Sequence, residues 1–107
     1  MTVSHLEPIY SSLGGDADLG QLVEMFVDEM PQRIADLLDR LHTFDWPGLR
    51  IVAHQLKGSA GSHGFPLISP AAARLEDALR QQRPYEEIRQ FVNEVVELCR
   101  CVRAGRP

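Results

Sequence analysis

The sequence predicts an all-α protein, folded as an up-down-up-down four-helix bundle with a short extra helix at its N-terminus. Apolar residues recur every three or four positions in four segments, which is the period of an amphipathic helix. Short connections join these segments, and no stretch alternates polar and apolar residues as a half-buried strand does. We expect a single domain over residues 1–107, with the bundle over about residues 18–103.

The short extra helix is predicted over about residues 4–13. Ser4 and Glu7 have the spacing of a capping box, in which two side chains satisfy backbone N–H groups at a helix start. The Gly14-Gly15 pair then marks the end of the helix. The apolar residues of this segment fall on one side: Leu6, Ile9, Tyr10 and Leu13.

The first bundle helix is expected to begin at Asp18, a capping residue followed three positions later by Gln21. Its apolar stripe consists of Leu19, Leu22, Val23, Phe26, Met30, Ile34, Leu37, Leu38 and Leu41. Pro31 lies within this stripe and removes one backbone donor. Because the stripe keeps its register past Pro31, we expect one kinked helix rather than two helices.

The other three helices also have recognisable boundaries. Asp45 is predicted to cap the second helix, with Pro47 in the first turn. Ser69 is predicted to cap the third, with Pro70 at the first helical position. The last helix carries an apolar stripe over residues 88–102, after which the tail RAGRP should fray.

Composition and charge exclude several classes of function. The apolar runs are far shorter than the roughly 20 residues that cross a bilayer, and the N-terminus lacks the pattern of a secretory signal. Cys99 and Cys101 would point about 200° apart on a helix, so they could neither bond each other nor share a metal. We therefore expect a reduced, cytoplasmic setting without membrane insertion. The net charge of −4 argues against general nucleic-acid binding.

The charge is distributed unevenly along the chain. Residues 1–45 carry nine acidic and two basic residues, a net charge of −7, whereas residues 46–107 carry six acidic and nine basic residues, a net charge of +3. The basic part would favour an acidic partner. Solvated helix faces explain the same pattern at least as well.

The segment AHQLKGSAGSHG, residues 53–64, lies in the second predicted bundle helix. On a helical wheel, its apolar stripe falls within roughly 60° of one direction and consists of Leu49, Val52, Ala53, Leu56 and Ala60. His54 lies about 140° from Leu49, so its imidazole is predicted to point into solvent. An exposed imidazole is mostly neutral at cytoplasmic pH, and its free nitrogen is nucleophilic.

Two cations and two glycines surround His54 on this predicted surface. Arg50 and Lys57 lie beside it, and Lys57 can reach a phosphoryl oxygen. Gly58 and Gly61 follow one and two turns later, although a glycine in a helix costs about 0.5–1 kcal/mol relative to alanine. The apolar stripe continues beyond Gly58, so this glycine does not end the helix. We interpret it as bare backbone that lets a second macromolecule approach the imidazole.

The segment HQLKGSAGSHG resembles the signature H-x-L-K-G-S-[AS]-x-x-x-G of histidine-containing phosphotransfer (HPt) domains. The positions that match in order and spacing are His54, Leu56, Lys57, Gly58, Ser59, Ala60 and Gly64. Three flanking segments also look like the family: FVDEMPQRIADLLDRL, DWPGLRIVA and AAARLEDALR. The resemblance covers roughly residues 16–103.

The resemblance implies that His54 is the phosphorylated residue and that Lys57 neutralises the phosphoryl group. Arg50, on the same face, is predicted to assist Lys57. Gly58 would give clearance to an incoming receiver domain, and Gly61 is predicted to extend that clearance.

Two further matched residues have implied roles. Gly64 would form the turn that closes the helix. Ser59 would help to position the phosphate or would only cap the helix, since its wheel angle near 280° points it away from His54.

The implied function is a phosphorelay carrier that accepts a phosphoryl group from a receiver aspartate and passes it to another. The implied partners are receiver domains of response regulators, and a hybrid sensor histidine kinase is a further candidate. The chain has no glycine-rich ATP loop, so we expect no kinase activity of its own. We expect no cofactor in this chain, because the Mg²⁺ of the transfer reaction would come from the receiver.

Two rival hypotheses remain open from the sequence. In the first, the bundle is an interaction module for a signalling partner, and His54 never carries phosphate. In the second, it is a metal-dependent enzyme that uses His54, His63 and the cysteines, although the spacing lacks any H-x-x-x-H, E-x-x-H or C-x-x-C pair. His5 and His42 are interpreted as surface or turn residues, and His63 as a loop residue close enough to His54 to influence it modestly.

Overall fold

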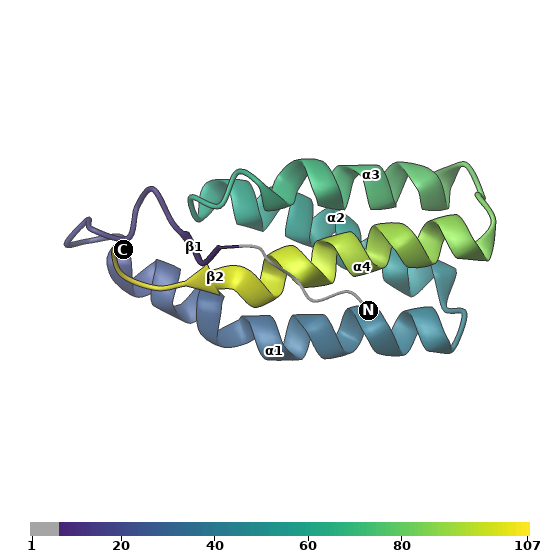
Figure 1. Ribbon diagram of the computed structural model, residues 1–107, viewed down its shortest axis with the longest axis horizontal. Helices are drawn as coiled ribbons and strands as arrows, with labels where there is room; N and C mark the ends of the chain where they lie inside the picture. Colours follow the sequence, from purple (N-terminus) through teal and green to yellow (C-terminus); the bar gives the residue numbers. More distant parts are fainter. Residues whose placement is uncertain (1–6) are drawn as a thin grey trace.

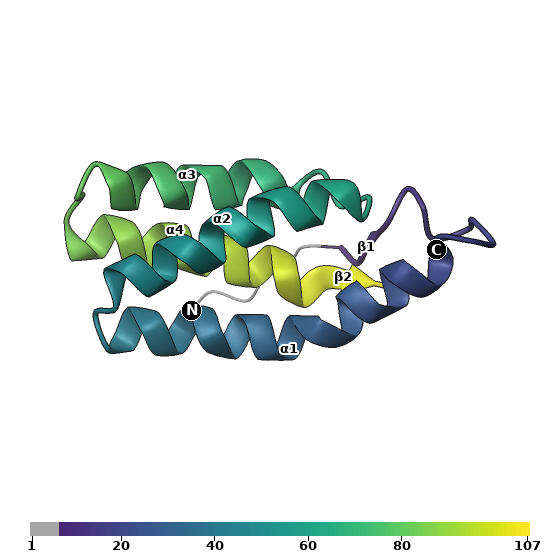
Figure 2. The same cartoon turned by 180° about the vertical axis from the view of Figure 1, so that it is seen from behind.

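The computed structural model describes residues 7–107 and contains four helices that pack side by side, as Figures 1 and 2 show. They are α1 (Gly20–His42), α2 (Trp46–Ser62), α3 (Ile68–Arg80) and α4 (Tyr85–Cys101). Successive helices are joined at alternating ends of the bundle (Figure 1). The predicted up-down-up-down four-helix bundle is therefore confirmed.

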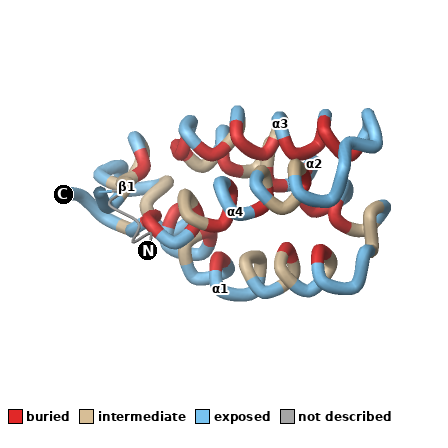
Figure 3. Tube along the Cα trace, turned by 45° about the vertical axis from the view of Figure 1, so that its right-hand side comes forward, coloured by how far each residue is buried: buried red, intermediate tan, exposed pale blue. Residues whose placement is uncertain are grey.

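The hydrophobic core lies along the axis between the four helices, where Figure 3 shows the buried segments facing inward. Every residue of the predicted α2 stripe is buried: Leu49, Val52, Ala53, Leu56 and Ala60. These inward positions fix the rotation of α2 about its own axis. The opposite face of α2 is consequently held toward solvent.

Helix α1 is continuous through Pro31, which lies on its exposed side. The helix changes direction part-way along its length, as seen in Figure 2. The prediction of one kinked helix is confirmed, because burial of residues on both sides of the proline holds the two halves in register.

The prediction of a helix over residues 4–13 is wrong for the part that the structure describes, and Ser4 lies outside the described residues. Strand β1 (Ile9–Tyr10) pairs in parallel with β2 (Val102–Arg103). The tail that was expected to fray therefore begins with a paired residue. Local apolar spacing favoured a helix, but pairing with the distant end of the chain satisfies the backbone instead.

Three capping residues are predicted, Asp18, Asp45 and Ser69, and only Asp45 caps its helix. Asp45 caps α2 as expected, since its side chain accepts a hydrogen bond from the Gly48 amide at 3.0 Å. Asp16, rather than Asp18, accepts backbone hydrogen bonds before α1. Ser69 lies inside α3 and does not cap it; its hydroxyl donates to the Lys57 carbonyl at 2.7 Å and so ties α3 to α2.

Within residues 7–107, no helix is both long enough and apolar enough to cross a membrane.

Candidate functional site

His54 projects from the solvent-facing side of α2, as the helical wheel predicts. Its side chain is 67% exposed, whereas Ala53 and Leu56 beside it in the sequence are fully buried. The core residues of α2 therefore determine where the imidazole points.

A buried carboxylate, which the sequence reasoning missed, holds the imidazole. Glu76 of α3 is only 5% exposed, and its Oε2 lies 2.8 Å from Nδ1 of His54. Its other oxygen, Oε1, accepts a hydrogen bond from Nζ of Lys57 at 2.7 Å. Arg80, one turn further along α3, lies 3.4 Å from Oε2. A buried charge needs partners of this kind, because desolvation without them is costly.

The Glu76 carboxylate remains ionised in this setting. The hydrogen bond from Lys57 lowers the pKa of Glu76, and the bond from His54 acts in the same direction, while burial opposes both. An ionised carboxylate only accepts hydrogen bonds, so Nδ1 of His54 must carry the hydrogen that it donates. The neutral ring then keeps its lone pair on Nε2. The nitrogen available for attack is therefore Nε2.

Lys57 lies beside His54 because both side chains bind the same carboxylate. Its side chain is 39% exposed, and an ammonium group has three N–H donors, of which Glu76 takes one. The remaining donors are available to an acceptor from outside the chain. The structure thus brings together His54, Lys57 and Glu76 at the contact between α2 and α3.

The three glycines of the motif have different surroundings. A Cβ atom at Gly58 would meet nothing within 4 Å, so no contact inside the chain requires a glycine there. At Gly61, a Cβ would lie 3.2 Å from the Ser69 hydroxyl, and the close approach of α3 accounts for that glycine. Gly64 has φ +83° just after α2, a conformation that favours glycine, and so forms the predicted helix-ending turn.

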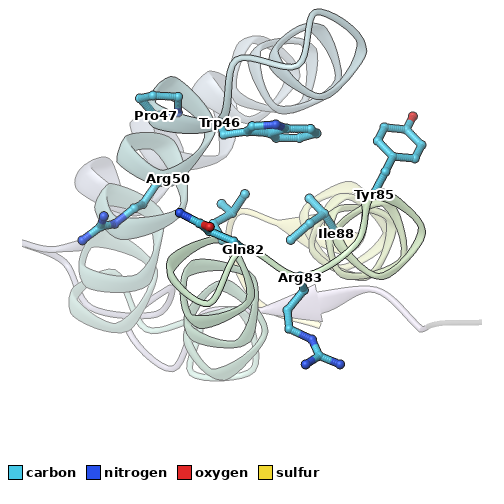
Figure 4. A pocket seen from close by; sticks show the side chains of 8 residues that line it. Trp46, Pro47, Arg50, Gln82, Arg83, Tyr85 and Ile88 are labelled. Atoms are coloured by element: carbon cyan, nitrogen blue, oxygen red, sulfur yellow. The ribbon is translucent and has the colours of Figure 1, made fainter.

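Arg50 and Ser59 stand apart from the His54–Glu76–Lys57 cluster. Arg50 is exposed and makes no ion pair with a carboxylate among the described residues; Figure 4 shows it at the edge of a pocket. The Ser59 hydroxyl oxygen is buried and has no hydrogen-bond partner in the described part of the chain. Among residues 7–107, neither side chain makes a hydrogen bond with the imidazole.

The model of the family described as the Hpt domain matches residues 21–104 of the chain. The chain belongs to the Hpt domain family. Hpt domains are histidine phosphotransfer carriers in two-component phosphorelays rather than kinases, and they interact with receiver domains and histidine kinases. Comparisons with curated proteins and with solved structures give no match.

The other described histidines of this Hpt domain lie elsewhere. The ring of His63 stacks on Phe26 of α1, with 4.8 Å between centroids, and its Nδ1 lies 2.7 Å from the Ser59 carbonyl. That is a different side of α2 from Glu76, and no contact joins His63 to the cluster within residues 7–107. His42 is exposed at the end of α1, as expected. His5 lies outside the described residues.

The hypothesis of a metal-dependent enzyme gains no support from the side-chain arrangement. Among residues 7–107, no three His, Cys, Asp or Glu side chains gather as metal ligands would. Cys99 lies in the core, and burial raises the pKa of its thiol to about 12, which disfavours the thiolate that a metal would need.

A signal for Glu76 was present in the sequence. In AAARLEDALR, Glu76 follows Ala72 by four residues and precedes Leu79 by three, so it falls on the apolar stripe of α3. A carboxylate at such a position requires a cationic or hydrogen-bonding partner from another helix. A charged residue within an apolar stripe is therefore the sequence signal that points to Glu76.

Acid should remove the stability that Glu76 contributes. The pKa of Glu76 is lower in the folded protein than in the unfolded chain. The stabilisation by Glu76 is therefore complete at pH values above the pKa of the unfolded chain. It is lost as the pH falls through the pKa of the folded protein. Urea unfolding of the wild type and of Glu76→Gln between pH 7 and pH 3 tests this expectation. The difference in unfolding free energy should shrink toward acid pH; a constant difference would contradict the assignment.

Proposed function

We propose that His54 accepts a phosphoryl group from the aspartyl phosphate of one receiver domain and passes it to the aspartate of another. The observation that carries this proposal is the exposed imidazole whose Nδ1 is held by the buried Glu76 carboxylate. This arrangement leaves Nε2 facing solvent with its lone pair. It suits a carrier whose reaction partner comes from outside the molecule.

In the acceptance step, the Nε2 lone pair attacks phosphorus and forms an N–P bond, while the bond from phosphorus to the aspartate oxygen breaks. The aspartate leaves as a carboxylate, and the imidazole ring becomes positively charged. Glu76 stabilises this charge through the Nδ1–H bond, and Lys57 offers donors to the phosphoryl oxygens. Donation to the second aspartate is the reverse of these steps.

The chain contributes positioning and charge in this scheme, and the receiver contributes the aspartate and its Mg²⁺. We propose that it needs no cofactor or ATP of its own and that it works in the cytoplasm. The direct experiment is incubation with candidate receivers carrying ³²P-labelled aspartyl phosphate, followed by location of the label. Acid-labile label on His54 is the expected result. Receivers that bind without transferring label would instead favour a non-phosphorylated interaction module.

Gly58→Glu should block docking of a receiver without removing the nucleophile. The added side chain would project into the open space beside His54, where it obstructs and repels an acidic partner. We expect receiver-dependent transfer to fall to background, while labelling by phosphoramidate, a small donor that needs no docking surface, stays at the wild-type level.

Gly58→Ala is the matched control for this substitution. Its Cβ meets no neighbour within 4 Å, so the variant should be more stable than the wild type by about 0.5–1 kcal/mol. Receiver-dependent transfer should remain measurable in Gly58→Ala. Normal transfer by Gly58→Glu would show that the open backbone is not part of the docking surface.

A further inference from the structure

We propose that a pocket at one end of the α2–α3 face receives an apolar side chain of the docked receiver, and that Arg50 pairs with a carboxylate next to that side chain. The inference rests on the proposed function and adds an anchor site that determines which receivers bind. It also gives Arg50 a role in docking in place of the predicted role in phosphate neutralisation.

The pocket has a volume of about 580 Å³ and lies where the α1–α2 and α3–α4 connections meet. Its lining combines apolar walls with a polar rim and consists of Trp46, Pro47, Arg50, Leu79, Gln82, Arg83, Tyr85 and Ile88. Figure 4 shows the side chains of Trp46, Ile88 and Tyr85 around one opening, with Arg50 at its edge. A space of this size and character suits a large apolar side chain.

The two connections that border the pocket both contain a non-glycine residue in the left-handed conformation. Phe44 and Gln82 each have φ 56°. Such a conformation costs on the order of 1 kcal/mol or more for an ordinary side chain. Phe44 is nevertheless 61% exposed, and its ring lies 5.8 Å from that of Trp46 and 5.7 Å from that of Tyr85. The strained turn thus presents an aromatic cluster to solvent.

The two arginines of the pocket differ in their partners. Arg83 binds Glu87 through two hydrogen bonds, at 2.9 and 3.1 Å. Arg50 pairs with no carboxylate among the described residues, and no acidic residue lines the pocket. A carboxylate from outside would therefore find an available guanidinium beside an apolar cavity. Tryptophan, tyrosine and arginine are also the residue types that dominate binding energy at protein interfaces.

The position of the pocket relative to His54 identifies its occupant. Arg50 and Trp46 precede His54 by four and eight residues on α2, which places them about 6 and 12 Å from it along the helix axis. A stable interface covers about 800 Å² on each partner, or a patch roughly 30 Å across. A receiver centred on His54 therefore extends over the pocket. For this reason we assign the pocket to the receiver rather than to a separate ligand.

Two substitutions test the inference with the receiver that transfers label in the experiment above. Phe44→Asn removes the exposed ring and places a residue tolerant of positive φ in the turn, and the relief of backbone strain offsets the ring contacts that are lost, so the variant should stay folded. Arg50→Gln removes the rim cation. Each should raise KM for the receiver by about tenfold and leave kcat unchanged, as expected for loss of one anchoring contact. Arg100→Gln, which removes an exposed arginine of α4, is the matched control and should leave both constants unchanged.

Trp46 is the only tryptophan of the chain, so it reports on the pocket directly. With 5-fluorotryptophan incorporated, its single ¹⁹F resonance should shift when the unphosphorylated receiver is added. Unchanged KM in both variants, or an unchanged resonance while transfer proceeds, would overturn the anchor site and leave the role of His54 intact. If no receiver transfers its phosphoryl label to this protein, both the proposed function and this inference are contradicted.

Discussion

His54→Gln should abolish phosphoryl acceptance and leave the bundle folded. Acceptance requires a lone pair on a nucleophilic nitrogen, and an amide nitrogen has none to offer. The fold should survive because the side chain is 67% exposed and lies off the buried stripe of α2. The glutamine amide can also donate to Glu76 in place of the imidazole. We therefore expect an unfolding free energy within about 0.5 kcal/mol of the wild type.

Two measurements check this expectation. Label transferred from a phosphorylated receiver should fall to the background of the assay, and urea unfolding should follow the wild-type curve. His63→Gln is the matched control, because its ring lies on Phe26 and outside the His54–Glu76–Lys57 cluster. Label retained by His54→Gln, or lost from His63→Gln, would place the acceptor elsewhere.

Glu76→Gln should slow phosphotransfer by at least about 10–100-fold, the effect of removing a carboxylate that orients a metal-bound imidazole. The amide oxygen can accept from Lys57, which turns the amide N–H toward Nδ1 of His54. Nδ1 of His54 then has to accept this hydrogen bond, so the ring hydrogen moves to Nε2. The Nε2 lone pair is no longer available to attack phosphorus. Loss of a buried charged acceptor should also cost about 1–3 kcal/mol of stability.

Asp77→Asn provides the comparison for Glu76→Gln. Asp77 is the next residue of α3, but its side chain is 60% exposed, and its one ion pair within the described part of the chain is with Arg80 at 3.3 Å. Such surface pairs contribute little, so transfer rate and stability should both remain near wild type. Imidazole ¹⁵N shifts of His54 should show the hydrogen on Nδ1 in the wild type and in Asp77→Asn, and on Nε2 in Glu76→Gln. Equal shifts in all three proteins would contradict the tautomer assignment.

The features that the sequence predicts correctly depend on local signals: the Asp45 cap depends on a capping residue, and the others depend on the periodicity of one helix. The inward stripe of α2 determines the outward direction of His54 and the open surroundings of Gly58, and both follow from positions within four turns of one another. The continuity of α1 through Pro31 follows from its own apolar stripe in the same way. No knowledge of the neighbouring helices is needed for these predictions.

The features that the sequence reasoning missed depend on which distant segments meet. Glu76 reaches His54 across 22 residues of chain, and only the packing of α3 on α2 makes it a ligand of the imidazole. Residues 9–10 pair with residues 102–103, so a segment with helical spacing becomes a strand. The Ser69 hydroxyl donates a hydrogen bond to the Lys57 carbonyl of α2 and does not cap α3. In the last two cases, tertiary contacts override the local preference.

The most direct test of the account is to identify the nitrogen that carries phosphate. The ¹⁵N-histidine-labelled protein, phosphorylated with phosphoramidate, should show one phosphorus nucleus coupled to Nε2 of His54, with the hydrogen still on Nδ1. Phosphate on Nδ1 of His54, or on any other histidine, would contradict the account.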